Sequence, residues 1–496
     1  MLNMTQWRTE EVATLLGGKG TRQGSKLERA RVTAFIKRRR LGLDLRSVPK
    51  KKRSAFVGHK RHANSQARKV IVSAKRGRIT ERELRNIGRQ TLMAKYRPSL
   101  LLGGLLPKRE DRWINMATRF RRRRKEAINV QNFSFLHDPN AAIRSLARIA
   151  RAEAEAVTAS IDFNDERCDD IGPWLVLAVL RNDMASIFTG GGISNSVSKV
   201  VSALELDDAL AMTVSPIWSV EKDIWAYPIK RRRPAGSSTS INFLLDPQAA
   251  EKLGDQLCEE VDRWLGEIVG QNLTTVGRRT VKTIVGETLD NAERHGRPDF
   301  PDDGDWMVSG MMVRRGPVEA PKFQCQLAFL SVGSSISETI ATCPDGIRSN
   351  MEEYVNLHRG KLSKLRFAEQ HLRTVYALQP GVTRDADAFN EGRGGVGFGY
   401  ITSFFADLAG IEDANSSARL AIVSGRTCLH IGYPYCTSRE GRHELRELWL
   451  NEHNDNSEPP DAGCIVELEH ELKGTLITMS FNLDRGYLER SINGTY

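Results

Sequence analysis

The sequence predicts an α/β protein of about three domains, and three observations lead to this prediction. The chain has 496 residues, which at roughly 150 residues a domain is too long for one small fold. From about residue 130 onward, stretches that alternate like strands are interspersed with stretches of helical periodicity. Positive charge gathers at one end: residues 1–125 hold 36 Lys and Arg against 8 Asp and Glu, a net of +28, whereas the remaining 371 residues carry −16. We expect domains at 1–125, 126–245 and 246–490.

The N-terminal domain is expected to be mainly helical and to bind nucleic acid. Helical spacing occurs at residues 9–16, 26–40 and 80–95. The basic runs are Lys37-Arg38-Arg39-Arg40, Lys50-Lys51-Lys52-Arg53 and Arg121-Arg122-Arg123-Arg124. Such charge density attracts polyanions and gives sequence-independent, salt-sensitive affinity for phosphate backbones. We therefore expect DNA or RNA as a partner; a solvated basic surface, or an arm that docks on the acidic remainder of the chain, is the alternative.

The central stretch predicts a small α/β domain. Its expected elements are a helix at 141–157, a strand at 159–163, a helix at 174–180, a glycine turn at 190–192 and a helix at 194–204. With the turn Asp169-Asp170-Ile171-Gly172, this order resembles a STAS domain, the fold of anti-sigma-factor antagonists. Asp170 stands where that family carries its phosphorylatable serine, which argues against a phospho-switch there. A generic α/β domain packed on its neighbour explains the same pattern.

A helix at residues 280–295 carries the first candidate site. Its apolar residues share one face, and Glu287, Asn291 and His295 follow at i, i+4 and i+8 along the border of that face. A carboxylate and a carboxamide one turn apart suit a hydrated Mg²⁺ that nucleotide phosphates complete. Glu287 is then placed to orient or deprotonate a water molecule. The same spacing also fits a surface helix with polar neighbours.

Two later segments support a phosphate site. A strand at 323–330 runs into a turn of small residues at 331–336, and the glycine-rich run 392–399 precedes a helix at 400–408. Glycines at a helix start let backbone N–H groups approach phosphate oxygens. The run is not a Walker loop, because no Gly-Lys-Ser/Thr follows, and it is a poor Rossmann fingerprint, because a polar loop precedes it.

In this order the motifs resemble the GHKL superfamily, the ATP-binding α/β sandwich of histidine kinases, anti-sigma-factor kinases, gyrase-type subunits and mismatch-repair ATPases. Glu287-x-x-x-Asn291-Ala292 with His295 resembles its asparagine box, and Ser331-x-Gly333-x-Ser335-Ile336 stands where Asp-x-Gly-x-Gly-Ile is usual. The resemblance covers roughly residues 250–485 and implies that ATP and Mg²⁺ are cofactors, with the polar stretch 337–391 as a mobile lid. The implied nucleotide contacts are Asn291, His295, Ser331, Gly333, Ile336, Arg393, Gly395, Gly397, Gly399 and Thr475, with Asn291 and Glu287 at the metal and Glu287 as the catalytic residue.

Two departures bear on the mechanism. The family's aspartate accepts a hydrogen bond from the adenine amino group, whereas Ser331 is shorter and neutral, so that adenine selectivity is expected to weaken. Ser335 replaces a glycine and is expected to narrow the approach to the base.

The order of motifs favours an ATPase whose nucleotide-driven switch, through lid closure and dimerisation, is coupled to the basic region. Bacterial antiviral defence or nucleic-acid maintenance would be natural settings by analogy. A protein kinase of a partner-switching or two-component pathway, with a protein partner, is the alternative, and a non-catalytic nucleotide-sensing scaffold is another. With no run of apolar residues long enough to span a bilayer and no signal-like N-terminus, a cytoplasmic protein without membrane contact is expected. The seven scattered cysteines are expected to be buried thiols.

Overall fold

A computed structural model describes most of the chain beyond residue 98. The described residues are 99–113, 125–156, 158–184, 187–210, 212–232, 250–295, 305–317, 321–362, 364–366, 368–391, 395, 397–409, 418–435 and 447–484. The expected N-terminal helices and all the basic runs lie outside them. The fold is mixed α/β, as expected. Within these ranges, no helix combines the length and the apolar character that crossing a membrane requires.

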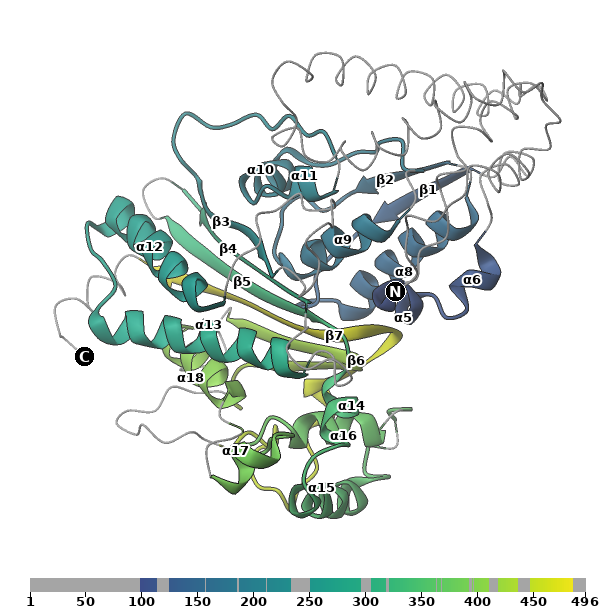
Figure 1. The fold of residues 1–496 in the computed structure, drawn as a ribbon. Coiled ribbons are helices and arrows are strands. Elements are labelled where there is room, and N and C mark those ends of the chain that lie inside the picture. Colours follow the sequence, from purple (N-terminus) through teal and green to yellow (C-terminus); the bar gives the residue numbers. More distant parts are fainter. Residues whose placement is uncertain are drawn as a thin grey trace, which may run out of the picture.

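A five-stranded antiparallel sheet forms the centre of the molecule (Figure 1). Its strands, in spatial order, are β3 (Ile224–Arg231), β4 (Asp305–Arg315), β5 (Lys322–Val332), β7 (Ile465–Asp484) and β6 (Arg419–Ile431). The inner strand β4 is buried on both faces from residue 305 to residue 313, which is the pattern of a sheet that is covered on both sides. Pro228 lies at the break in register between β3 and β4, and the edge position of β3 tolerates its missing N–H.

Helices cover both faces of this sheet (Figure 1). On one face lie α12 (Ala250–Val269), α13 (Thr275–His295) and α18 (Gly397–Ala409), whose apolar residues share a core with Phe329 and Ile477. On the other face lie α5 (Leu100–Leu105), α8 (Pro139–Glu155) and α9 (Gly172–Asp183), packed on a second core that includes Leu330 and Leu476. Adjacent residues of β5 and β7 therefore face different cores, because side chains alternate along a strand.

The central α/β unit contains a small parallel sheet. Strand β1 (Lys125–Val130) pairs in parallel with β2 (Thr158–Phe163), and α8 connects them. The segment at 187–193 extends β2 through two parallel bridges, Ala159 to Phe188 and Phe163 to Ile193. Helices α10 (Asn195–Ala203) and α11 (Leu206–Leu210) follow and lead to β3. The expected helices and the strand at 159–163 are thus present, with ends shifted by a few residues.

The boundary expected after residue 245 does not separate two packing units. Strand β3 precedes that boundary, yet it is hydrogen-bonded to β4, and Ile224 and Ile229 belong to the core that α8 and α9 share with the large sheet. The sequence suggested a linker because small and turn-forming residues follow residue 233. That composition begins just after β3 ends at Arg231.

The boundary at residue 125 also differs from the packing. The leucine-rich helix α5 is buried against α8 and β7. The next short helix, α6 (Arg109–Arg112), is held by a buried ion pair of 2.8 Å between Arg109 and Glu153 on α8, and the Trp113 indole N–H donates to the same carboxylate. Residues 99–113 therefore belong to the folded body, since an uncharged leucine run gains more from burial than from exposure beside basic residues.

The stretch expected as a polar lid is a helical subdomain (Figure 1). It contains α14 (Ile336–Ile340), α15 (Asp345–His358), α16 (Ala368–Tyr376) and α17 (Ala386–Asn390), and a turn η1 (Ala462–Cys464) lies in the segment that packs against it. Tyr354, Tyr376 and Trp449 meet in an aromatic cluster with ring centroids 5.0 to 6.0 Å apart. Gln379 ties α16 to residue 448 through two hydrogen bonds. The buried residues of this subdomain are continuous with the core that α12, α13 and α18 share with the sheet.

Candidate functional site

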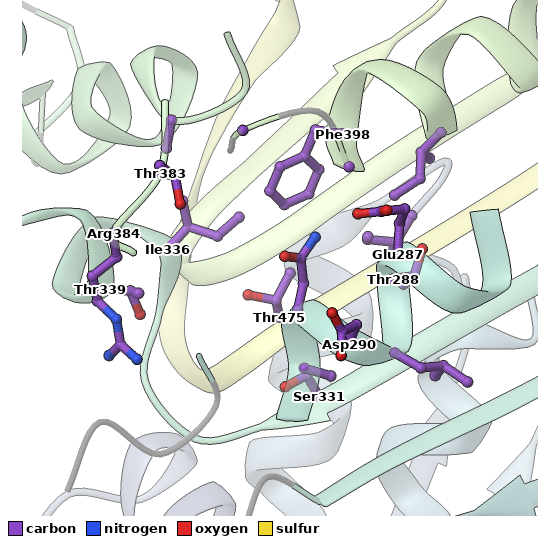
Figure 2. A pocket seen from close by; sticks show the side chains of 18 of the residues that line it. Glu287, Thr288, Asp290, Ser331, Ile336, Thr339, Thr383, Arg384, Phe398 and Thr475 are labelled. Carbon is purple, nitrogen blue, oxygen red and sulfur yellow. The ribbon is translucent and has the colours of Figure 1, made fainter. Parts of the chain in front are cut away.

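A cavity of about 500 Å³ opens between α13, α14, the start of α18 and the segment at 382–387 (Figure 2). Its floor is formed by the end of β5 and the middle of β7. Of the residues singled out in the sequence, the cavity brings together Glu287, Asn291, Ser331, Ile336, Gly395, Gly397 and Thr475. Residues more than a hundred positions apart in the chain therefore line one space.

Helix α13 presents Glu287 and Asn291 to this cavity. Ile284, Val285 and Leu289 are buried on the sheet side of the helix, with exposed fractions of 1% each. That packing fixes the rotation of the helix, so the side chains one turn apart on its border face the cavity. The side chain of His295 lies outside the described residues.

Gly397 lies directly against the polar border of α13. A Cβ atom at this position would strike the side-chain amide nitrogen of Asn291 and would lie 3.7 Å from a Glu287 carboxylate oxygen. A side chain here would displace the Asn291 amide, and glycine lets the first turn of α18 approach without that displacement. The N–H groups of that first turn, which have no acceptor within the helix, and the positive end of the helix dipole adjoin the cavity.

Gly395 serves a different contact. Its φ is +75°, and its carbonyl oxygen accepts a hydrogen bond of 3.1 Å from Gly381 N–H. A Cβ there would lie 2.6 Å from the carbonyl carbon of Gly381. The glycine run thus holds the turn at 381–382, and this turn brings the following residues to the cavity wall.

Three hydroxyl side chains lie in a row across the floor. Ser331 on β5 is paired with Thr475 on β7, which is paired with Ser424 on β6. Ser331 and Thr475 line the cavity, whereas Ser424 is completely buried. Ser424 Oγ lies 2.9 Å from Thr475 Oγ1, 3.0 Å from the Gly474 carbonyl oxygen and 2.8 Å from Ile336 N.

Ser335 does not have the place that the motif suggested. It is 1% exposed and caps α14, accepting a hydrogen bond of 3.2 Å from Glu338 N–H while the Glu338 carboxylate accepts one from Ser335 N–H. Burial tends to raise the pKa of Glu338, but the Ser335 N–H and the Lys473 ammonium outweigh this effect and hold it below its usual value. Ser335 is not among the residues that line the cavity, so the expectation that it narrows access to a base is wrong.

The segment at 382–387 contributes cavity residues that sequence reasoning missed. Thr383, Arg384, Asp385 and Asp387 line the cavity, and Figure 2 shows Thr383 and Arg384 across from Glu287 of α13. Partial burial lowers the pKa of the Arg384 guanidinium, and Asp385 opposes this shift. The polar Thr-Arg-Asp stretch just ahead of the glycine run is the sequence feature that indicates these residues, but it lies within the stretch 337–391 that the resemblance identifies as a lid.

The cavity is mainly acidic. Among its described lining residues, Arg384 is the one cationic side chain, while Glu287, Asp290, Asp385 and Asp387 are carboxylates. A polyphosphate could enter only if a cation compensates this charge, because like charges repel strongly in a partly enclosed site. The carboxylate of Glu287 and the amide oxygen of Asn291 are oxygen donors of the kind that Mg²⁺ takes together with phosphates. The described residues contain no cluster of three or more His, Cys, Asp or Glu side chains for a metal held by protein alone.

The remaining expected site residues are placed elsewhere or not described. Gly333 lies in the turn after β5 and Gly399 in the first turn of α18, and neither lines the cavity. Arg393 lies outside the described residues, as do Lys37 to Arg40, Lys50 to Arg53 and Arg121 to Arg124. The six described cysteines are buried, as expected.

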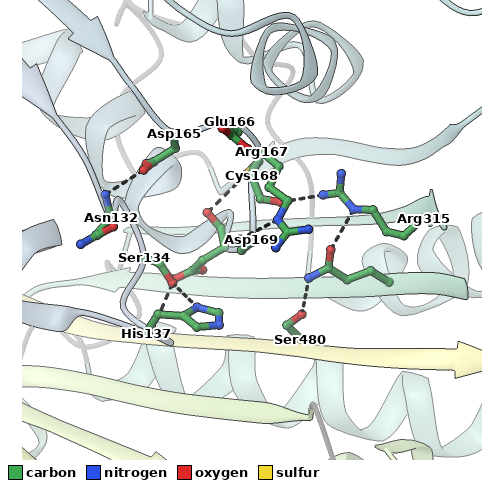
Figure 3. A network of polar contacts seen from close by, with 12 residues as sticks. Asn132, Ser134, His137, Asp165, Glu166, Arg167, Cys168, Asp169, Arg315 and Ser480 are labelled. Carbon is green, nitrogen blue, oxygen red and sulfur yellow. Dashed lines mark hydrogen bonds and ion pairs between the residues drawn. The ribbon is translucent and has the colours of Figure 1, made fainter.

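The turn that resembles a phosphorylation site is enclosed between the central unit and the large sheet. Asp170 has no exposed surface and accepts hydrogen bonds of 2.7 Å from Phe135 N–H, 2.8 Å from Gly172 N–H and 2.6 Å from the Thr478 hydroxyl on β7. Burial raises its pKa. Beside it, Arg315 on β4 donates to the Cys168 carbonyl oxygen at 3.1 Å (Figure 3). This turn therefore joins the two units rather than offering a modifiable group to solvent.

Comparison of the chain with protein-family models, with curated proteins and with solved structures found no match. A functional assignment therefore depends on the residues of the cavity.

Proposed function

We propose that the chain is an ATP-binding ATPase of the GHKL type, whose Mg-ATP-dependent conformational switch is coupled to a basic region that binds DNA or RNA. One observation carries the proposal: a single cavity joins the Glu287 and Asn291 edge of α13 to Gly397 at the start of α18 and to the hydroxyl floor. A helix N-terminus, a carboxamide and a carboxylate at one end suit a metal-held polyphosphate. An apolar wall with hydroxyl groups at the other end suits a base.

Each residue then has a defined task. Asn291 contributes an amide oxygen to the metal without adding negative charge, and the N–H groups of the first turn of α18 receive phosphate oxygens. Glu287 orients the attacking water and accepts its proton. Bound Mg²⁺ would supply neutralisation of phosphate charge in this acidic cavity. Arg384, on the opposite wall, adds a positive charge from the protein.

The connectivity of the packed elements supports the proposed coupling to nucleic acid. The buried pair Arg109 and Glu153 fastens the segment that leads from the basic region to α8, and α8 packs on β7. Strand β7 also carries Thr475 in the cavity floor. A continuous set of packed elements thus joins the site to the attachment point of the basic region.

Asn291→Ala tests the nucleotide site. Loss of the metal-binding oxygen should abolish stabilisation by Mg-ATP, which at a ligand concentration of 100 times Kd is about 2.7 kcal/mol. Thr283→Ala is the matched control, since Thr283 lies on the same helix but does not line the cavity. Thermal unfolding with and without Mg-ATP measures the effect. An unchanged ligand-induced shift in Asn291→Ala would exclude the site.

Labelled γ-phosphate tests the reaction. Release as inorganic phosphate, reduced in Glu287→Gln, supports the ATPase. Transfer of label to protein would contradict it in favour of a kinase, and retention of intact ATP would leave a nucleotide-sensing scaffold.

A truncated chain tests the nucleic-acid arm. Because residues 99–113 are part of the folded body, the truncation should start at residue 99, with serine at the four arginines of 121–124. It should keep Mg-ATP binding and lose the salt-sensitive affinity for DNA and RNA. On duplex DNA, the logarithm of the binding constant falls by about 0.9 for each phosphate contact when the logarithm of the salt concentration rises by one unit. Undiminished nucleic-acid affinity would refute the assignment to the basic region.

A further inference from the structure

Ser424 is the buried member of the hydroxyl row on the cavity floor, and its hydrogen bonds decide which way the neighbouring Thr475 hydroxyl points. Ser424 contributes nothing to the cavity surface, yet it contacts two groups that line it, the Thr475 side chain and the backbone of Ile336. It is fully buried, so water cannot complete its hydrogen bonding. Its three neighbours therefore decide where its single proton lies.

Two of these neighbours have a fixed role. Ile336 N–H, 2.8 Å away, can only donate, and the Gly474 carbonyl oxygen, 3.0 Å away, can only accept. The third neighbour, Thr475 Oγ1 at 2.9 Å, can do either. A serine hydroxyl has one proton to donate and two lone pairs that accept.

One arrangement makes all three contacts hydrogen bonds. Ser424 donates to the Gly474 oxygen and accepts from Ile336 N–H and from the Thr475 hydroxyl. If Ser424 donated to Thr475 instead, its lone pairs would face the Gly474 carbonyl oxygen at 3.0 Å at a position with no exposed surface. The Thr475 proton is therefore directed into the protein, and its lone pairs remain for the cavity.

We propose that Ser424 is a positioning residue that fixes the Thr475 hydroxyl as a hydrogen-bond acceptor at the cavity floor, so that the site selects a nucleotide base that presents an N–H group there. The inference rests on the proposed nucleotide function and adds the chemistry of the base. The exocyclic amino group of adenine and the N–H groups of guanine are the two sources of such a donor. The neighbouring Ser331 hydroxyl can donate or accept and does not by itself impose a polarity.

The same contacts also place the apolar wall. By accepting from Ile336 N–H, Ser424 holds the start of α14 against β6, and the Ile336 side chain then lines the cavity. A base that reaches Thr475 thus meets an aliphatic surface fixed by the same serine. Polarity and shape at this end of the cavity depend on one buried hydroxyl.

Base discrimination in the full-length protein tests the proposal. The probes are ADP, GDP and purine riboside 5′-diphosphate, which lacks the 6-amino group, each titrated with Mg²⁺ by calorimetry. The wild type should bind the better of ADP and GDP about ten-fold more tightly than the purine riboside nucleotide, the factor that one hydrogen bond of about 1.4 kcal/mol provides. Ser424→Ala frees the Thr475 proton to turn toward the cavity, so this ratio should fall to about two-fold or less.

Three further variants separate polarity from folding. Ser309→Ala is the matched control, because Ser309 is also a completely buried serine of the same sheet, bonded to the Tyr227 carbonyl oxygen at 3.1 Å, and its loss should leave the ratio unchanged. Thr475→Val should abolish discrimination, and Thr475→Ser should retain it. This pair decides the matter even if Ser424→Ala fails to fold.

Each outcome bears on one of the two proposals or on both. If Ser424→Ala or Thr475→Val kept the wild-type ratio of affinities between the better of ADP and GDP and the purine riboside nucleotide, the proposed role of the hydroxyl row would be overturned. If the wild type prefers GDP and Ser424→Ala loses that preference, the Thr475 hydroxyl is supported as the acceptor and guanine is identified as the base that donates. Wild-type nucleotide binding without discrimination would overturn this inference alone, whereas failure to bind any of the probes would overturn the proposed function as well.

Discussion

At the scale of single residues, the cavity is lined both by side chains positioned within one helix and by side chains positioned through contacts between loops. Glu287 and Asn291 were predictable because helical periodicity alone places them on the border of an apolar face. Arg384 and Asp385 were not, because they reach the cavity only through the turn that Gly395 holds by its hydrogen bond with Gly381. Spacing within one element can be read from a sequence, whereas contacts between loops depend on the folded chain.

His371 offers a prediction at this scale. Its ring is completely buried, Nδ1 lies 2.9 Å from Thr427 Oγ1, and no partner for Nε2 is present among the described residues. Burial, with a smaller contribution from Arg426, lowers its pKa to about 4, whereas the unfolded chain has the ordinary value near 6.5. The unfolded state therefore binds more protons between these values, and this residue's contribution to stability is lost as the pH falls through that window.

Between pH 7 and pH 5, His371 should lower the free energy of unfolding by about 2 kcal/mol. His371→Gln should remove this part of the loss, as measured by urea unfolding at both pH values. His453→Gln is the control, because His453 is exposed beside Glu458 and its pKa is raised. An equal pH dependence in wild type and His371→Gln would contradict the assignment.

At the scale of elements, α14 shows how a motif can be assigned to the wrong task. Ser335 was interpreted as a substitution for a glycine near the base, although Ser335 and Glu338 also have the spacing of a capping box. The structure uses the second pattern. Most other elements were predictable in type, since the amphipathic α13 and the alternating β5 show their periods clearly, while the helices at 336–390 were obscured by the polar composition of that stretch.

Ser335→Ala should therefore lower stability by about 1 kcal/mol, the usual cost of losing an N-cap side chain. Ser335→Gly should cost only a few tenths, because glycine is itself a fair N-cap residue. Denaturant unfolding compares the two variants with the wild type. An alanine variant as stable as the glycine variant would show that the cap does not stabilise α14.

At the scale of the whole molecule, Asp170 joins the central unit to the large sheet. Its fully buried carboxylate accepts hydrogen bonds from backbone N–H groups and from the Thr478 hydroxyl. Asp170→Asn keeps the shape but points an amide N–H₂ at one or more of these donors. We expect a loss of about 2 kcal/mol or more, since a buried donor is left unsatisfied. Thr478→Val should cost less, because the backbone donors remain paired. Urea unfolding measures both, and an asparagine variant of wild-type stability would contradict this role.

The course of β3 has a practical consequence for anyone who wishes to produce the C-terminal half alone. A fragment that begins near residue 246 would lack this strand, so the row of amide and carbonyl groups along β4 would be open to pairing with other molecules, and the apolar surface beneath α9 would be bare. Such a fragment should precipitate or form intermolecular sheets, and the smallest well-behaved piece of this protein should begin upstream of α5.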